Sequence, residues 1–195
     1  MSNSGGMSIY ARQSWIGRLN YNYKEKYLAE FIFRRDGSLK FPTNSRWGNF
    51  PAVLGAWRIS EENFWKENIS FFDYFKLRGS IGKIGMDPGN PFQFINKYAL
   101  GAGMTFGESK DVVTKIYQST IANPNITWEE QTTYNIGFDS YLLDQMFHFN
   151  AEVFYNNRSD ILVARDASVP AYTGLSLPSE NIAEVENRGF EIDLG

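Results

Sequence analysis

The feature of this sequence that most constrains its fold is an alternation of apolar and polar side chains over long stretches. In residues 9–23 the odd positions are mostly apolar or aromatic and the even positions are mostly polar. The pattern is clearest in residues 147–156, where every odd position from Phe147 to Tyr155 is apolar or aromatic. Successive side chains of a β-strand point to opposite faces, so a period of two predicts strands with one apolar face.

Seven segments carry this pattern or a weaker form of it, and no segment shows a convincing helical period. They are residues 9–23, 27–35, 50–59, 75–84, 128–142, 147–156 and 187–194. Residues 61–73 are the one candidate for a short helix or turn. The sequence therefore predicts an all-β chain.

The connections between these segments sort by length. The links after the first, third and fifth segments are short or intermediate, at residues 24–26, 60–74 and 143–146. The other links are long and rich in Gly, Pro, Asn and Ser, at residues 36–49, 85–126 and 164–186. All long loops then fall at one end of an up-and-down meander, which is the organisation of an outer-membrane barrel. A Greek-key sandwich is not expected to sort its loops in this way.

Strand length and aromatic content favour the same fold. Several segments exceed ten residues, and a tilted strand needs about 9–11 residues to cross the hydrocarbon of a bilayer. Aromatic residues make up 16% of the chain, and many lie near expected strand ends, as in interfacial girdles. These are Trp15, Tyr21, Tyr23, Tyr27, Trp57, Phe75, Trp128, Tyr141 and Tyr155. We expect an antiparallel up-and-down transmembrane β-barrel segment of about seven strands, whose alternation explains a mean hydropathy of only −0.38.

Composition excludes several kinds of chemistry. The chain has no Cys and a single His, His148, which rules out a Cys/His zinc site, an iron–sulfur cluster and a cysteine nucleophile. A net charge of −3 gives no electrostatic case for nucleic acid. We expect no catalytic residue, no cofactor and no metal, and we place His148 on the polar face of a strand, inside the barrel lumen.

Two other functional classes remain open at this point. A soluble β-sandwich, such as a carbohydrate-binding module, could use the same aromatic rings as its core. A β-rich hydrolase would need paired carboxylates, but the adjacent Glu129 and Glu130 point to opposite faces of a strand and cannot flank one bond. Polar residues of the 85–126 loop could bind calcium, although no spaced calcium-loop signature is present: Asp87, Asn90, Asp111 and Asn123.

Residues around the first long loop are the candidates for contact with a ligand or a lid protein. Arg35 and Asp36 precede that loop and could form a charge-assisted network that stiffens the strand end. Trp47 could stack on a sugar ring, since the flat face of an aromatic suits the apolar face of a pyranose. We therefore select Arg35, Asp36 and Trp47. Gly37 and Gly85 lie where strands pass into loops, and we expect them to serve as turn glycines.

Several segments, in order along nearly the whole chain, resemble the barrel of SusC/RagA-type TonB-dependent outer-membrane receptors of Bacteroidetes. They include Gly17–Tyr23 (GRLNYNY), Arg34–Ser38 (RRDGS), Gly55–Glu62 (GAWRISEE), Leu77–Gly82 (LRGSIG), Asn135–Asp139 (NIGFD) and Glu186–Glu191 (ENRGFE). The resemblance implies a barrel of roughly 22 strands with a plug domain. We therefore expect residues 9–195 to be a partial barrel without a plug. Residues 1–8 would be a disordered or vector-derived N-terminus.

The resemblance also implies a function. The intact protein would lie in the cell outer membrane, surrounded by outer-membrane lipid, and would import glycan or oligopeptide fragments. A SusD-like lipoprotein would cover its outer end as a lid, and energy would come from TonB–ExbB–ExbD through the plug. The identity of the substrate lies beyond this sequence, because specificity would depend on the plug, the lumen and the loops together.

Overall fold

Strands dominate the computed structural model, which describes residues 9–69, 71–108, 111–164 and 177–195. The strands are β1 (Arg12–Tyr23), β2 (Tyr27–Ser38), β3 (Trp47–Arg58), β4 (Phe72–Met86), β5 (Lys97–Phe106), β6 (Asp111–Thr120), β7 (Glu129–Leu142), β8 (Phe147–Ala164) and β9 (Ser179–Leu194). A 3-10 turn, η1 (Ile59–Glu61), and one helix, α1 (Asn63–Asn68), follow β3. The fold is all-β, as predicted, and residues 1–8 lie outside the described part.

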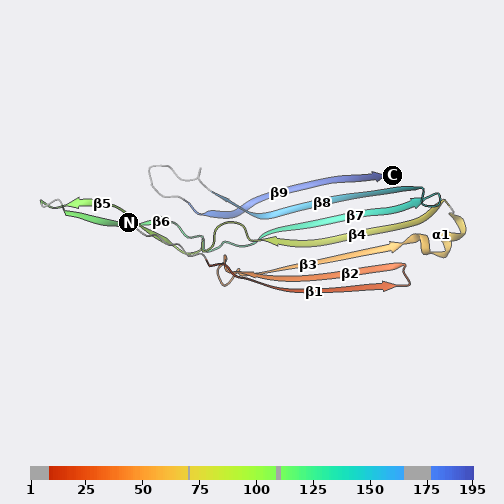
Figure 1. Cartoon of the computed structure of the whole chain (residues 1–195), viewed down its shortest axis with the longest axis horizontal. Helices are drawn as coiled ribbons and strands as arrows, with labels where there is room; N and C mark the ends of the chain where they lie inside the picture. The colour runs from red at the N-terminus through yellow and green to blue at the C-terminus, as the bar shows by residue number, and fades with distance from the viewer. Residues whose placement is uncertain (1–8, 70, 109–110, 165–176) are drawn as a thin grey trace, which may run out of the picture.

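Seven of the strands form one antiparallel sheet in the order β1-β2-β3-β4-β7-β8-β9. Figure 1 shows these strands side by side as a long wall, with β1 and β9 at its two edges. Each strand pairs with the next strand of the sheet along the chain, so the predicted up-and-down meander is confirmed. The wall is an open sheet, since β1 and β9 do not pair with each other in the described structure.

The connections sort as predicted, with short turns at one end of the wall. The hairpin between β1 and β2 has positive φ at Lys24 and Glu25, and the β7–β8 turn has positive φ at Leu143, Asp144 and Gln145. Left-handed residues in a hairpin turn match the right-handed twist of the flanking strands. We call this the turn end of the wall, and the opposite end the loop end.

The long loops are shorter than predicted because the strands extend beyond the alternating segments. Two strands, β5 and β6, lie within the expected 85–126 loop and form a separate hairpin that projects beyond the loop end (Figure 1). The expected 36–49 loop shrinks because Gly37 pairs with Trp47. The 164–186 loop shrinks because β9 begins at Ser179, and its residues 165–176 lie outside the described part.

The alternative of a two-layer sandwich is wrong, because the described residues form one sheet and one hairpin and no second sheet packs on the first. The buried hydrophobic side chains gather at the loop end as a small cluster: Phe41, Phe50, Ile126 and Trp128. Trp128, expected in an interfacial girdle, is therefore a core residue with only 3% exposure. The described helix is too short to span a membrane.

Gly37 and Gly85 are not turn glycines. Both lie within strands, and neither has positive φ. A side chain at Gly37 would lie 2.8 Å from the Trp47 ring, and one at Gly85 would overlap the Phe50 ring. These glycines make room for aromatic rings, which is a packing role.

Candidate functional site

The register of the sheet divides the wall into an apolar face and a polar face. One row of paired residues crosses all seven strands on the apolar face: Tyr21, Ala29, Gly55, Gly79, Ile136, Val153 and Phe190. The larger side chains of this row are 61–73% exposed, and the row contains no charge. The neighbouring row on the other face holds Asn22, Leu28, Ala56, Arg78, Gly137, Glu152 and Glu191.

Ion pairs on the polar face connect three adjacent strands, β4, β7 and β8. Lys76 Nζ lies 2.5 Å from Asp139 Oδ2, and Arg78 Nε lies 3.2 Å from Asp139 Oδ1. Arg78 also reaches across β7, where its Nη2 lies 2.6 Å from Glu152 Oε2. The guanidinium can cross because its register partner on β7 is Gly137, whose missing side chain leaves the space open. We call Lys76, Arg78, Asp139 and Glu152 the charge ladder.

A hollow of about 740 Å³ lies beside the charge ladder, along β1 to β4. Polar and charged side chains contribute to its lining: Asn20, Asn22, Glu30, Arg58, Tyr74 and Lys76. The cations of Arg58 and Lys76 lie 5.3 Å and 5.9 Å from the centre of the Tyr74 ring. This face can therefore hold polar material through hydrogen bonds, charge and ring contacts.

A buried polar cluster fixes the strands at the loop end. Asp87, which is 6% exposed, pairs with Arg12, accepts a 2.8 Å hydrogen bond from Ser38 Oγ and lies 4.0 Å from Lys40 Nζ. Lys40 also donates a 2.7 Å hydrogen bond to the Asp87 carbonyl. Because a buried carboxylate needs such partners, Asp87 has a structural role in the described part and is not left free for calcium.

Another polar residue of the expected 85–126 loop also makes a structural hydrogen bond. Asn123 donates a 2.7 Å hydrogen bond from Nδ2 to the Ser179 carbonyl. The side chain of Asp111 lies outside the described residues. Within the described part of the chain, no group of three or more acidic, His or Cys residues is placed to hold a metal ion.

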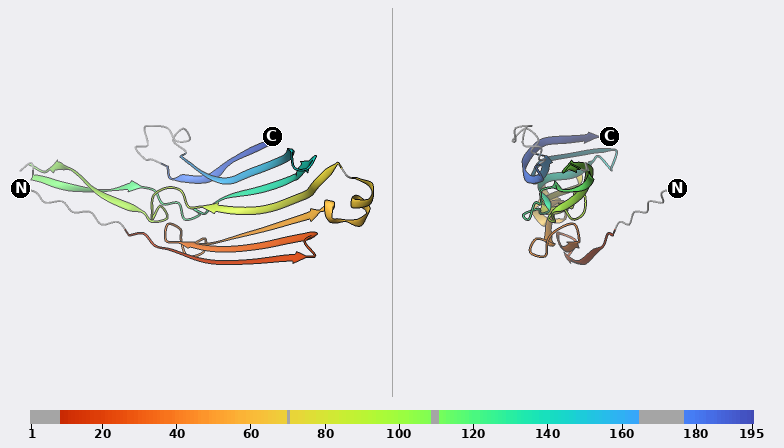
Figure 2. Two further views of the ribbon diagram at one scale, coloured as in Figure 1. Left: turned by 45° about the vertical axis from the view of Figure 1, so that its right-hand side comes forward. Right: turned by 90° about the vertical axis from the view of Figure 1, so that its left-hand side faces the viewer.

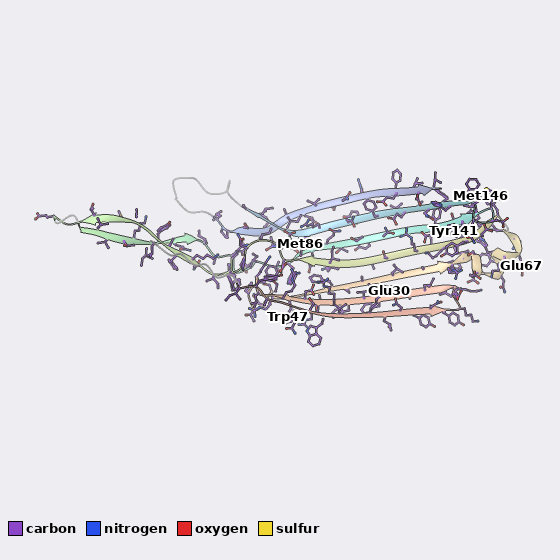
Figure 3. All side chains as sticks on the ribbon, in the orientation of Figure 1. Glu30, Trp47, Glu67, Met86, Tyr141 and Met146 are labelled. Atoms are coloured by element: carbon purple, nitrogen blue, oxygen red, sulfur yellow. The ribbon has the colours of Figure 1, made fainter. Side chains whose placement is uncertain are left out.

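The three candidate contact residues separate onto the two faces of the wall. Arg35 and Trp47 share the apolar side at the loop end, where the guanidinium lies 5.2 Å from the centre of the indole ring. Asp36 points to the other face, is 2% exposed and accepts a 2.7 Å hydrogen bond from Arg34 Nε. Figure 3 labels Trp47 at the loop end of the wall. The structure therefore brings Arg35 and Trp47 together and places Asp36 on the opposite face of the sheet.

The remaining sequence candidates lie in ion pairs. Glu129 pairs with Arg158 on β8, whereas Glu130 pairs with Lys83 on β4, which agrees with their opposite orientation. His148 Nε2 lies 3.0 Å from Asp193 Oδ2, on the polar face of the wall as predicted. Tyr141, expected in a girdle, shares that polar face, because it is the register partner of His148.

The charge ladder was missed by sequence reasoning. Each of its four residues lies at a polar-face position of an alternating segment: Lys76, Arg78, Asp139 and Glu152. Their common face could therefore be predicted from the alternation. Their contacts depend on the pairing of β4 with β7 across a long insertion, and no local pattern specifies that register. The available signal was Gly137, a residue without a side chain at a polar-face position of its strand, where a long side chain from a neighbouring strand can pass.

A second polar cluster joins the turns at the turn end. Glu62 accepts hydrogen bonds from Lys26 Nζ at 2.9 Å, Tyr27 hydroxyl at 2.8 Å and Trp57 Nε1 at 3.1 Å. The hydrogen bonds from Lys26, Tyr27 and Trp57 lower the pKa of Glu62 from its usual 4.5 to about 2. The β3–β4 connection is thus tied to the first hairpin by a charged carboxylate.

This low pKa predicts how the turn end responds to acid. Because the folded pKa lies below the usual value, the stabilisation is fully present above pH 4.5 and is lost as the pH falls towards about 2. Glu62→Gln should remove that part of the acid dependence, whereas Glu67→Gln, on the exposed side of α1, should retain it. Stability against urea, measured at several pH values between neutral and acid, checks this. Equal acid dependence of wild type and Glu62→Gln would contradict it.

A long antiparallel meander with one apolar and one polar face is the wall of a membrane β-barrel. The chain matches the family model of the TonB dependent receptor-like β-barrel over residues 5–195. It therefore belongs to the TonB-dependent receptor β-barrel family, whose members are in general outer-membrane proteins.

Relatives in the curated proteins agree. TonB-dependent receptor P39 of Formosa agariphila is 35% identical over 187 residues, which are 96% of this chain and 17% of that protein. TonB-dependent receptor SusC of Bacteroides thetaiotaomicron is 32% identical over 190 residues, with coverage of 93% of this chain and 18% of that protein. The chain thus spans less than a fifth of the length of these relatives.

Solved structures share the fold. The RagAB peptide importer in its 'closed-closed' state matches with a TM-score of 0.79 and 22% identity, covering 95% of this chain and 19% of that chain. The siderophore receptor PirA from Pseudomonas aeruginosa matches with a TM-score of 0.58 and 15% identity, covering 94% of this chain and 30% of that chain.

Proposed function

We propose that this chain is part of the barrel wall of an outer-membrane transporter that imports glycan or oligopeptide fragments, and that it does no catalysis itself. The two-faced wall carries the proposal. Its apolar face would contact outer-membrane lipid, and the polar face with the charge ladder would line the lumen. The relatives named SusC and the RagAB peptide importer support this assignment.

Energy and gating would come from parts outside this chain. In receptors of the SusC/RagA type, a plug domain couples to TonB–ExbB–ExbD. The hollow between Glu30, Arg58 and Lys76 would face that plug or the cargo from the lumen side. No nucleic acid is involved in this proposal.

A SusD-like lipoprotein lid is the second partner, and we propose that the β5–β6 hairpin meets it. Tyr98, Leu100 and Ile116 lie on one face of the hairpin and are 66–73% exposed. A two-stranded hairpin is only marginally stable in water, so it gains by packing its apolar face on another protein. Figure 2 shows the hairpin extending away from the wall in a second orientation.

Substitutions in the hairpin test the lid contact. The double variant Leu100→Ser with Ile116→Ser should lower recovery of the lid lipoprotein with the purified receptor by about tenfold. The reason is that two aliphatic side chains that the lid would bury on binding are lost. Lys115→Ser, on the opposite face of the hairpin, should leave recovery unchanged. Equal recovery for all three proteins would place the lid contact elsewhere.

Arg35, Asp36 and Trp47 remain our candidates for ligand or lid contact at the loop end. Arg35 and Trp47 would make the contact, because their side chains lie together and are exposed at the loop end of the wall. Asp36 would support them from the opposite face by holding Arg34.

Uptake by living cells tests the function as a whole. Cells that lack the full-length receptor should fail to grow on one class of glycan or peptide fragments and should recover when the gene is restored. A receptor variant that carries both Lys76→Met and Arg78→Met should fold and reach the outer membrane. If the polar face lines the transport path, this variant should import the fragments poorly. Normal growth on every glycan and peptide mixture without the receptor would overturn the proposal.

A further inference from the structure

The helix α1 packs on the apolar side of the wall. The Trp65 ring stacks on Phe75, with 5.1 Å between ring centres and 21° between planes, and also contacts Phe72 at 5.8 Å. Phe75 in turn stacks on Phe138 at 5.5 Å, and Phe138 meets Phe149 edge-on at 5.2 Å. This row of rings joins α1 to the face that carries the uncharged row, so α1 lies outside the wall and not over the polar face.

The two sides of α1 differ in polarity. Trp65 packs on the wall, and Phe64 lies about 100° from it around the helix. Lys66 lies about 160° from Phe64 and so on the other flank of α1, whereas Glu67, one turn after Phe64, lies only about 60° from it. Phe64 is 53% exposed although it is next to the packed Trp65. One flank of α1 thus carries the Phe64 ring, and the other carries the charge of Lys66.

Other exposed apolar side chains surround α1 at the turn end. Phe71 is 53% exposed, and its carbonyl accepts a 3.4 Å hydrogen bond from the amide of Leu143 in the β7–β8 turn. Leu143 is 48% exposed and Met146 is 71% exposed. Figure 3 labels Glu67, Tyr141 and Met146 together at this end of the wall. We define Phe64, Phe71, Leu143 and Met146 as the turn-end rim.

We propose that α1 and the turn-end rim lie in the inner-leaflet interface of the outer membrane, at the boundary between phospholipid headgroups and acyl chains. This rests on the proposed function, in which the apolar face meets lipid and the short turns face the periplasm. The row of ring contacts from Phe149 through Phe138 and Phe75 to Trp65 continues the apolar face of the wall onto α1. Aromatic and apolar side chains favour this interface, and Lys66, on the other flank of α1 from Phe64, would point towards water.

Site-directed fluorescence quenching tests the depth of α1 in the membrane. The chain contains no Cys, so a single introduced cysteine carries the only bimane label within it. The full-length protein is placed in phospholipid nanodiscs, with labels at Phe64→Cys and, as the matched control on the other flank of α1, Lys66→Cys. A nitroxide lipid labelled close to the headgroup should quench the label at position 64 about threefold more than that at position 66, and aqueous iodide should show the reverse order.

A third label separates this inference from the proposed function. Val153→Cys, in the middle of the uncharged row and 62% exposed, should be quenched by nitroxide lipids. If it is not, the apolar face does not meet lipid and the proposed function fails. If Val153→Cys is quenched by lipid while positions 64 and 66 are equally open to iodide, only the position of α1 is overturned. Protection of position 64 from both quenchers would indicate a protein cover and would also overturn it.

Discussion

Replacing Phe50 with alanine is expected to lower the free energy of unfolding by about 3–5 kcal/mol, as for other large rings removed from a core. Phe50 is 3% exposed and belongs to the small buried cluster at the loop end. Its ring meets Trp128 edge-on at 5.4 Å and fills the space left open by Gly85. Because four buried residues form this cluster, the loss of one ring leaves a cavity that the others cannot fill.

A matched variant on the apolar face separates core packing from simple loss of a ring. Phe31 is 44% exposed on that face, so Phe31→Ala should cost much less when the protein is in lipid. Urea-induced unfolding in lipid vesicles, followed by tryptophan fluorescence, measures both variants. Equal destabilisation by the two substitutions would show that the loop-end cluster is not a core.

Gly137→Ala is expected to give the second large effect, a destabilisation of about 1–3 kcal/mol from overpacking. A methyl group at this position would lie 2.8 Å from the Ala151 carbonyl oxygen and 2.9 Å from the Glu152 Cβ. It would also lie 3.3 Å from the Arg78 Cζ, in the path by which Arg78 reaches Glu152. The substitution should therefore strain β7 against β8 and weaken the charge ladder together.

Gly79→Ala is the control for this prediction. Gly79 lies in the adjacent β4 on the apolar face, and a methyl group there would come no closer than 3.8 Å to the atoms around it. The temperature at which the folded band shifts on an electrophoresis gel should fall for Gly137→Ala and change little for Gly79→Ala. A fall of similar size in both would mean that strand propensity, and not the crossing of Arg78, determines the result.

Local alternation was sufficient to predict the two faces of the wall. The odd positions of residues 9–23 and of 147–156 share one face in the structure. A strand repeats every two residues, and the register pairs apolar-face positions of one strand with apolar-face positions of the next. The sorting of loops followed from counting residues between alternating segments. The alternation and the lengths of the connections are short-range features of the sequence, and the structure confirms the two faces and the sorted loops that they predict.

Features that depend on irregular backbone could not be predicted in this way. The ladder between β5 and β6 shifts register between Gly101 and Met104, so their alternation is broken and the segment resembles a loop. Strand β8 continues past an irregularity at Asp160, which has a positive φ of 56°. A shift in register inverts the faces of the residues that follow, and a period-two search then stops too early.

The candidate contact site was predicted only in part. Adjacent residues of a strand point to opposite faces, so Arg35 is separated from Asp36 as Glu129 is separated from Glu130. The closeness of Arg35 to Trp47 required the β2–β3 register, which the sequence of either strand does not contain.

The pairing of β4 with β7 begins at Met86 and Glu129, so the residues between them leave and re-enter the wall at the same point. The hairpin of β5 and β6 is therefore an excursion that adds nothing to the ladder of the sheet. Its length and sequence can change over generations, or be exchanged between relatives by a designer, while the strands of the wall keep their alignment. The part of the chain that projects beyond the loop end can thus diversify independently of the seven-stranded sheet.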